Sequence, residues 1–60
     1  MKPENCNTIY DVRKFCEDNS DHPITAAWTD MLYDMDEFGE DYTVEDFLDE
    51  LEQQRVLGKV

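Results

Sequence analysis

Sixty residues suffice for one small domain, and a domain of this size buries only about 60% of the surface of its unfolded chain. The chain carries 16 Asp and Glu against 5 Lys and Arg, a net charge of −11. Because binding to phosphates requires clustered Lys and Arg, this balance excludes direct binding to nucleic acids and to anionic membranes. The longest apolar runs are three residues, so no membrane-spanning segment is predicted.

The amino-terminal segment MKPENCNTIY lacks the apolar stretch of a signal peptide, and we therefore expect a cytoplasmic protein. The two cysteines, Cys6 and Cys16, lack the C-x-x-C spacing that is typical of zinc sites. In this compartment we expect reduced thiols rather than a disulfide. No cofactor is predicted.

Residues 8–18 are predicted to form the first helix. Thr8 occupies an N-cap position, and Asp11, three residues later, completes a variant of the capping box. Apolar residues follow a helical period along one face: Ile9, Val12, Phe15 and Cys16. Opposite charges four residues apart are expected to pair along this helix, Arg13 with Glu17 and Lys14 with Asp18.

Residues 22–36 carry the clearest helical period of the chain, which predicts the second helix. Pro23 suits a first helical turn, where its missing N–H costs nothing. The apolar positions are expected to form core rather than an adaptable binding surface, because they follow the helical period: Ile24, Ala27, Trp28, Met31, Leu32 and Met35.

Residues 43–57 are predicted to form the third helix. Thr43 is again a plausible N-cap, with Asp46 three residues later, and Gly58 is a plausible stop signal. Arg55 and Lys59 suit the negative end of the helix dipole. The apolar stripe consists of Val44, Phe47, Leu48 and Leu51. Three amphipathic helices with short connections predict an all-α fold, a compact three-helix bundle in a single domain over residues 1–60.

The connection between the second and third helices, DMDEFGEDYTVE, resembles the loop of an EF-hand calcium site. Asp34, Asp36, Gly39 and Glu45 match positions 1, 3, 6 and 12 of such a loop. Position 5 is Phe38, which has no side-chain oxygen, and position 8 is Asp41. A degenerate calcium site is therefore a minor alternative. The favoured interpretation is a simple turn with Gly39 in a left-handed conformation and Phe38 packed inward, and no metal site is predicted.

No catalytic residues are predicted. His22 is the only histidine, and it lies between Asp21 and Pro23 in a polar turn. A catalytic histidine needs a positioned nucleophile and an orienting group, which immediate sequence neighbours rarely supply. A chain of this length also leaves little room for a substrate pocket. We therefore expect a protein that is not an enzyme.

Acidic residues are concentrated in one part of the chain. Between Asp21 and Gln54 there are twelve carboxylates and no Lys or Arg. On the third helix, Asp49 lies four residues after Glu45 and three before Glu52, and such like-charge pairs destabilise a helix. The simpler explanation is that the acidity serves solubility alone. Solubility, however, does not require a long segment without Lys or Arg. The segregation favours a surface that meets a strongly basic partner.

Five carboxylates of the third helix fall within about 12 Å, given the rise of 1.5 Å per residue. This linear charge density is comparable with that of one DNA strand. In size and charge the chain resembles small acidic helical proteins that mimic DNA, many of them phage-encoded inhibitors, although it shares no motif with them. The resemblance implies an acidic protein-binding module that occupies the basic cleft of a nucleic-acid-binding protein and inhibits or modulates it.

The residues predicted to contact this partner are eleven carboxylates and two tyrosines: Asp30, Asp34, Asp36, Glu37, Glu40, Asp41, Glu45, Asp46, Asp49, Glu50, Glu52, Tyr33 and Tyr42. Tyr10 and Phe38 are further candidates for apolar anchoring, since exposed aromatic residues are enriched at interfaces.

The alternative hypothesis is a small regulatory or adaptor domain whose acidity is incidental. It would bind a protein partner, or itself as a homodimer, through exposed apolar residues: Tyr33, Met35, Val56, Leu57 and Val60.

Overall fold

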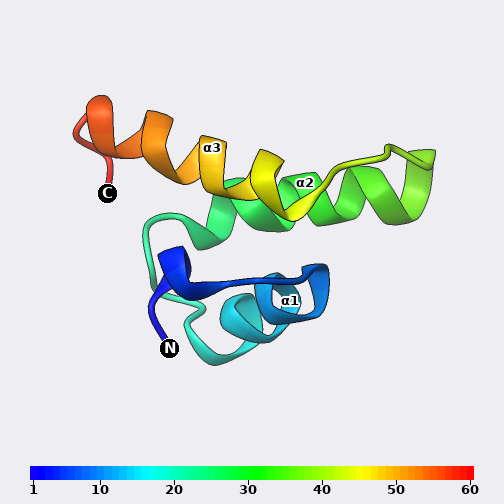
Figure 1. The fold of residues 1–60 in the computed structure, drawn as a ribbon, viewed down its shortest axis with the longest axis horizontal. Helices are drawn as coiled ribbons and strands as arrows, with labels where there is room; N and C mark the ends of the chain where they lie inside the picture. Colours follow the sequence, from blue (N-terminus) through cyan, green and yellow to red (C-terminus); the bar gives the residue numbers. More distant parts are fainter.

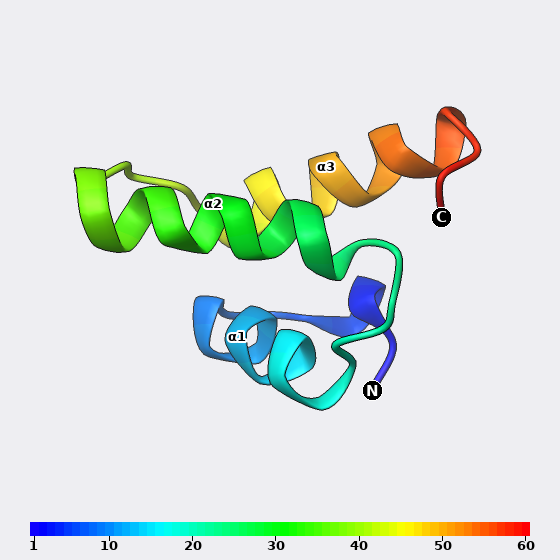
Figure 2. The same ribbon diagram turned by 180° about the vertical axis from the view of Figure 1, so that it is seen from behind.

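The computed structural model describes every residue from Met1 to Val60. A short 3-10 helix, η1 (Pro3–Asn5), precedes three α-helices: α1 (Ile9–Asp18), α2 (Thr25–Phe38) and α3 (Val44–Val56). Helices α2 and α3 lie side by side, and α1 packs beneath them with its axis turned away from theirs (Figures 1 and 2). The predicted all-α three-helix bundle is confirmed.

Two capping boxes fix where α1 and α3 begin, as the sequence predicts. The Thr8 hydroxyl accepts a hydrogen bond from the backbone N–H of Asp11 at 3.1 Å, and the Asp11 carboxylate accepts one from the N–H of Thr8. In α3 the Asp46 carboxylate accepts from the N–H of Thr43 at 2.8 Å, and the Thr43 hydroxyl accepts in return. Each box satisfies backbone donors that have no partner within the helix.

Helix α2 begins at Thr25, three residues later than predicted. Pro23 lies in the turn before the helix, where side chains form hydrogen bonds with nearby backbone groups. The N–H of Ile24 donates to Nδ1 of His22 at 3.2 Å, and the Thr25 hydroxyl donates to the carbonyl oxygen of Asn19 at 2.6 Å. These bonds satisfy polar groups locally and delay the helix.

The turn after α2 is partly as predicted. Gly39 adopts the left-handed conformation with φ of 69° and ends the helix. The inward packing predicted for Phe38 is wrong, because this residue is 72% exposed. Its ring packs edge to face against Tyr33, with 6.1 Å between ring centres. The last turn of α2 extends beyond α1, so no neighbouring helix covers Phe38 there (Figure 1).

Trp28 is the centre of the core and is fully buried. Its ring packs edge to face against Phe15 of α1 and Phe47 of α3, with ring centres 5.5 and 6.1 Å away. Its indole N–H donates to the backbone carbonyl of Phe47 at 2.8 Å, so the one polar atom of the ring is satisfied. The buried apolar residues are Cys6, Val12, Phe15, Ile24, Trp28, Leu32, Phe47 and Leu51. The apolar stripe of α2 therefore forms part of the core, and Met31 and Met35 are half-buried against it.

The segment before α1 also belongs to the packed structure, although no element is predicted there. Helix η1 packs against α3, and Arg55 donates to the carboxylate of Glu4 at 3.0 Å. At the other end of the chain α3 ends at Val56, and Gly58 follows with φ of 76°. Both termini therefore lie at the same end of the molecule (Figure 1).

Candidate functional site

The acidic block is defined as the twelve carboxylates between Asp21 and Glu52. Asp34 and Glu50 are half-buried, and the other ten are exposed. The carboxylates of α2 and α3 lie outside the apolar core because the helical period that directs the core residues inward directs the acidic residues outward. The block is thus a surface feature of two adjacent helices and of the loop that joins them.

Three of the predicted contact residues have partners within the protein. Asp36 accepts two hydrogen bonds from Arg13 of α1, and Asp46 closes the capping box of α3. Glu50 accepts a hydrogen bond from Gln54 at 2.7 Å. Of the twelve carboxylates, Asp36 alone forms a salt bridge with a basic residue.

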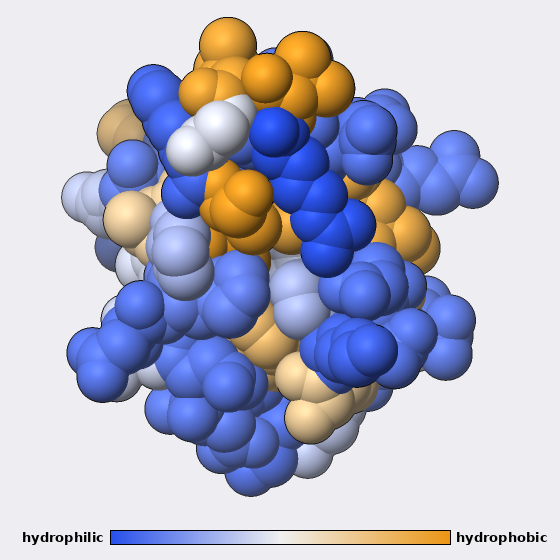
Figure 3. All heavy atoms as spheres, turned by 90° about the vertical axis from the view of Figure 1, so that its left-hand side faces the viewer, coloured by the Kyte–Doolittle hydropathy of each residue, from blue (hydrophilic) through white to orange (hydrophobic).

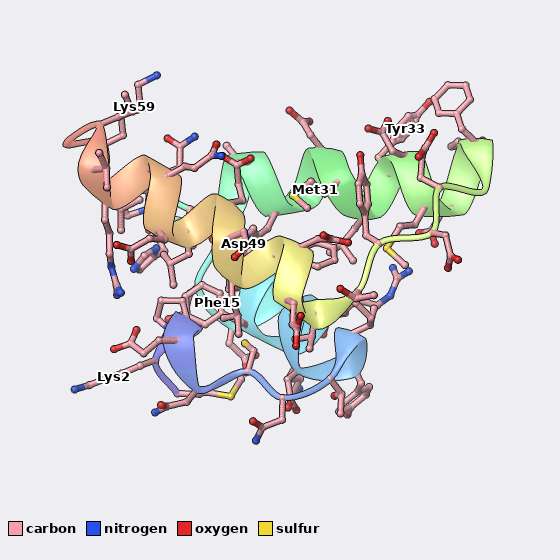
Figure 4. The ribbon with its side chains drawn as sticks, turned by 45° about the horizontal axis from the view of Figure 1, so that its top comes forward. Lys2, Phe15, Met31, Tyr33, Asp49 and Lys59 are labelled. Carbon is pink, nitrogen blue, oxygen red and sulfur yellow. The ribbon has the colours of Figure 1, made fainter.

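The remaining carboxylates of α3, Glu45, Asp49 and Glu52, are exposed and have no basic partner. Figure 4 shows Asp49 on the outward side of α3. The like charges that the sequence places three and four residues apart are therefore left unneutralised on this helix. This self-repulsion is the clearest sign that α3 is not optimised for its own stability.

The two tyrosines that were predicted as contact residues differ in environment. Tyr33 is 52% exposed. Tyr42 is half-buried and packs edge to face against Phe47 at 6.1 Å between ring centres, so it belongs to the rim of the core. Burial raises the pKa of its hydroxyl, and the neighbouring carboxylates of Asp34, Glu40 and Asp46 raise that pKa further. Tyr42 thus packs against the core and keeps part of its surface exposed.

A groove lies between α1 and α2, with a volume of about 470 Å³. Arg13 and Asp36 join its two sides through a bidentate ion pair, with nitrogen–oxygen distances of 2.7 and 3.1 Å. The pair raises the pKa of Arg13 and lowers the pKa of Asp36. The residues lining the groove are Arg13, Cys16, Glu17, Thr29, Leu32, Tyr33, Asp36 and Glu37.

Both cysteines are free thiols in the structure. Cys6 is buried, and Cys16 is half-buried in the groove. Burial raises the pKa of both thiols, which lowers the fraction of reactive thiolate at neutral pH.

A second hollow, of about 330 Å³, lies at the carboxyl end of α3 beside Glu52, Gln53, Val56 and Leu57. Val56 is 77% exposed and Leu57 is 64% exposed, and apolar side chains gather at the top of this end of the molecule (Figure 3). Met35 and Val60 are half-buried against the core instead, so the apolar surface of the alternative hypothesis is not continuous. Its exposed members fall into two separate places, Tyr33 on α2 and the Val56–Leu57 pair.

The connection that resembles an EF-hand loop in sequence does not have its side chains arranged as in a calcium site. Asp36, which would be the ligand at position 3, is engaged by Arg13, and Glu45 lies in the first turn of α3 after the capped Thr43. No group of three or more His, Cys, Asp or Glu side chains in the structure is arranged to hold a metal ion. His22 packs edge to face on Phe15 and accepts a backbone hydrogen bond, which gives it a structural role.

The ion pairs Arg13–Asp36 and Glu4–Arg55 could not be found from sequence spacing, because 23 and 51 residues separate their members. The predicted pair of Arg13 with Glu17 is replaced by the pair with Asp36, whereas Lys14 and Asp18 do approach each other, at 3.9 Å. None of the helices is long and apolar enough to cross a membrane. Comparisons of the chain with protein-family models, with curated proteins and with solved structures find no match.

Proposed function

We propose that the protein is an acidic binding module that occupies the basic cleft of a nucleic-acid-binding protein and so inhibits or modulates it. The observation that supports this proposal is the state of the acidic block. A single salt bridge neutralises one of its twelve carboxylates, and ten of the twelve are exposed. A surface whose charges are left unpaired at the expense of the fold is suited to an external basic partner.

Helix α3 is the part of the block that a phosphate-binding groove fits best. Glu45, Asp49 and Glu52 are exposed along one rigid element, at a rise of about 1.5 Å per residue. A DNA strand presents a charge about every 3.4 Å. The five carboxylates of α3, taken together, have a comparable average charge density along the helix axis. Rigidity favours binding because little conformational freedom is lost when the partner is bound.

The proposal is tested by capture on the immobilised protein. A cell lysate is applied at low salt, and the bound proteins are eluted with a salt step and identified by mass spectrometry. We expect nucleic-acid-binding proteins, whose retention is abolished by competing DNA and weakens steeply as salt rises. Retention that is unchanged between low and high salt would contradict the proposal.

A matched pair of charge reversals localises the contact. Asp49→Lys with Glu52→Lys alters two exposed carboxylates of α3. Asp18→Lys with Asp21→Lys makes the same change of net charge at the end of α1 and in the turn that follows it, where neither residue is a predicted contact. We expect the α3 variant to lose affinity for the captured partner by about 100-fold or more, since like-charge juxtaposition at an interface costs several kcal/mol. The α1 variant is expected to lose much less. Asp46 is left unchanged because it caps α3.

The alternative function, an adaptor that binds through an apolar face, is favoured by one observation, the exposure of Val56 and Leu57 at the end of α3. Sedimentation over a range of concentrations tests whether this end forms a homodimer. Partner binding that survives the α3 charge reversal but is lost on Val56→Ser with Leu57→Ser would support the adaptor instead.

A further inference from the structure

We infer that the groove between α1 and α2 is a receptor for an arginine side chain of the partner. The inference rests on the proposed function and names the chemistry by which one part of the acidic surface recognises its partner. It goes beyond general charge attraction, because a groove that prefers arginine would distinguish among basic proteins.

The groove walls have the composition that a guanidinium group requires. Glu17 on α1 and Glu37 on α2 are exposed carboxylates without a basic partner. Tyr33 supplies an aromatic side chain that is 52% exposed, and the half-buried Cys16 supplies apolar contact surface. Carboxylates accept the planar fork of arginine, an aromatic face stacks on it, and its methylene stem packs on apolar surface.

The charge of the groove favours a cationic occupant. Arg13 contributes one positive charge and Glu17, Asp36 and Glu37 contribute three negative charges, so the net charge of the lining is −2. The charge of Arg13 is already compensated by its two hydrogen bonds to Asp36. The uncompensated negative charge of the lining therefore belongs to Glu17 and Glu37. An anion or a second copy of this acidic chain would meet uncompensated repulsion at the same place.

Arginine is preferred over lysine at such a site for a geometric reason. The ammonium group of lysine is a compact, strongly hydrated charge that cannot stack on Tyr33 or form a planar fork with a carboxylate. Arginine makes both contacts and is the more weakly hydrated cation, so it loses less on leaving water. Cation–π contact at exposed sites gives an expected preference of about three- to fivefold.

The test compares nona-arginine with nona-lysine, two peptides of equal charge, by titration calorimetry at low salt. The wild-type protein is expected to bind nona-arginine about three- to fivefold more tightly. In the groove variant, Glu17→Gln with Glu37→Gln, this ratio is expected to fall towards one. Tyr33→Leu is expected to reduce the ratio as well, because it removes the aromatic face and keeps an apolar side chain.

The control variant is Glu45→Gln with Glu52→Gln, which removes the same charge from exposed positions of α3. We expect it to weaken both peptides by the same factor and to keep the preference for arginine. A preference that persists in the groove variant, or equal affinity of the wild type for both peptides, would overturn the inference and leave the proposed function standing. Failure of both peptides to bind at low salt would overturn the proposed function as well.

Discussion

At the scale of single residues, stability and surface charge are carried by different side chains. Trp28 is fully buried and joins all three α-helices through its ring contacts and its hydrogen bond to Phe47. The bidentate pair of Arg13 and Asp36 is largely in solvent, with side chains 43% and 55% exposed, and solvent-exposed pairs contribute little to stability. The core, not the salt bridges, therefore holds the bundle together.

We expect Trp28→Phe to lower the free energy of unfolding by about 2–3 kcal/mol, because it leaves a cavity and removes the hydrogen bond to the Phe47 carbonyl. Denaturant unfolding followed by circular dichroism measures the change. Tyr10→Phe, at a side chain that is 71% exposed, is the control and is expected to change stability by less than about 0.5 kcal/mol. Equal effects of the two substitutions would show that Trp28 is not the centre of the core.

At the scale of elements, local sequence signals locate most helix ends. The Thr8 and Thr43 caps and the left-handed Gly39 were all predictable, because each depends on residues within four positions. The start of α2 was not, since the bond from Thr25 to Asn19 competes with the signal from Pro23. Two other features could not be predicted from local patterns. Helix η1 and the exposure of Phe38 both depend on where the neighbouring helices lie and end.

Substitution by Ala is expected to change the stability of the fold in opposite directions at two acidic residues of α3. Asp46→Ala should destabilise the fold by about 1 kcal/mol, because it breaks the capping box. Asp49→Ala should stabilise it by a few tenths of a kcal/mol, since it removes repulsion from Glu45 and Glu52 and introduces a strong helix former. Thermal unfolding of the two variants beside the wild type measures both changes. A loss of stability in Asp49→Ala would show that this carboxylate has a structural partner.

At the scale of the whole molecule, the net charge of −11 acts against the compact state. Part of the candidate site was predictable. The sequence identifies the acidic block, because the positions of charged residues along the chain can be counted without a structure. The groove was not predictable, because Glu17 and Glu37 come together only when α1 packs against α2. The contact of Tyr42 with Phe47 was not predictable either, because the sequence shows only that Tyr42 lies off the apolar stripes.

Salt should therefore affect the fold and the binding in opposite directions. We expect the melting temperature to rise by about 5 °C or more between about 10 mM and about 500 mM NaCl, because screening relieves self-repulsion. Partner binding should weaken over the same range. The variant Asp49→Lys with Glu52→Lys, whose net charge is −7 (−11 plus 4), should show a smaller rise in melting temperature. A melting temperature that falls with salt would mean that attractive pairs outweigh repulsion.

Trp28 also provides an intrinsic fluorescence probe of folding. The chain contains a single tryptophan, and its indole is shielded from water between Phe15 and Phe47. Its fluorescence emission should therefore be blue-shifted in the native state and move to the red on unfolding. Asp49 and Glu52 of α3 are exposed and outside the core, so substitutions there leave the surroundings of the indole intact. A variant that loses its partner with unchanged emission has lost a contact, whereas one with red-shifted emission has lost the fold.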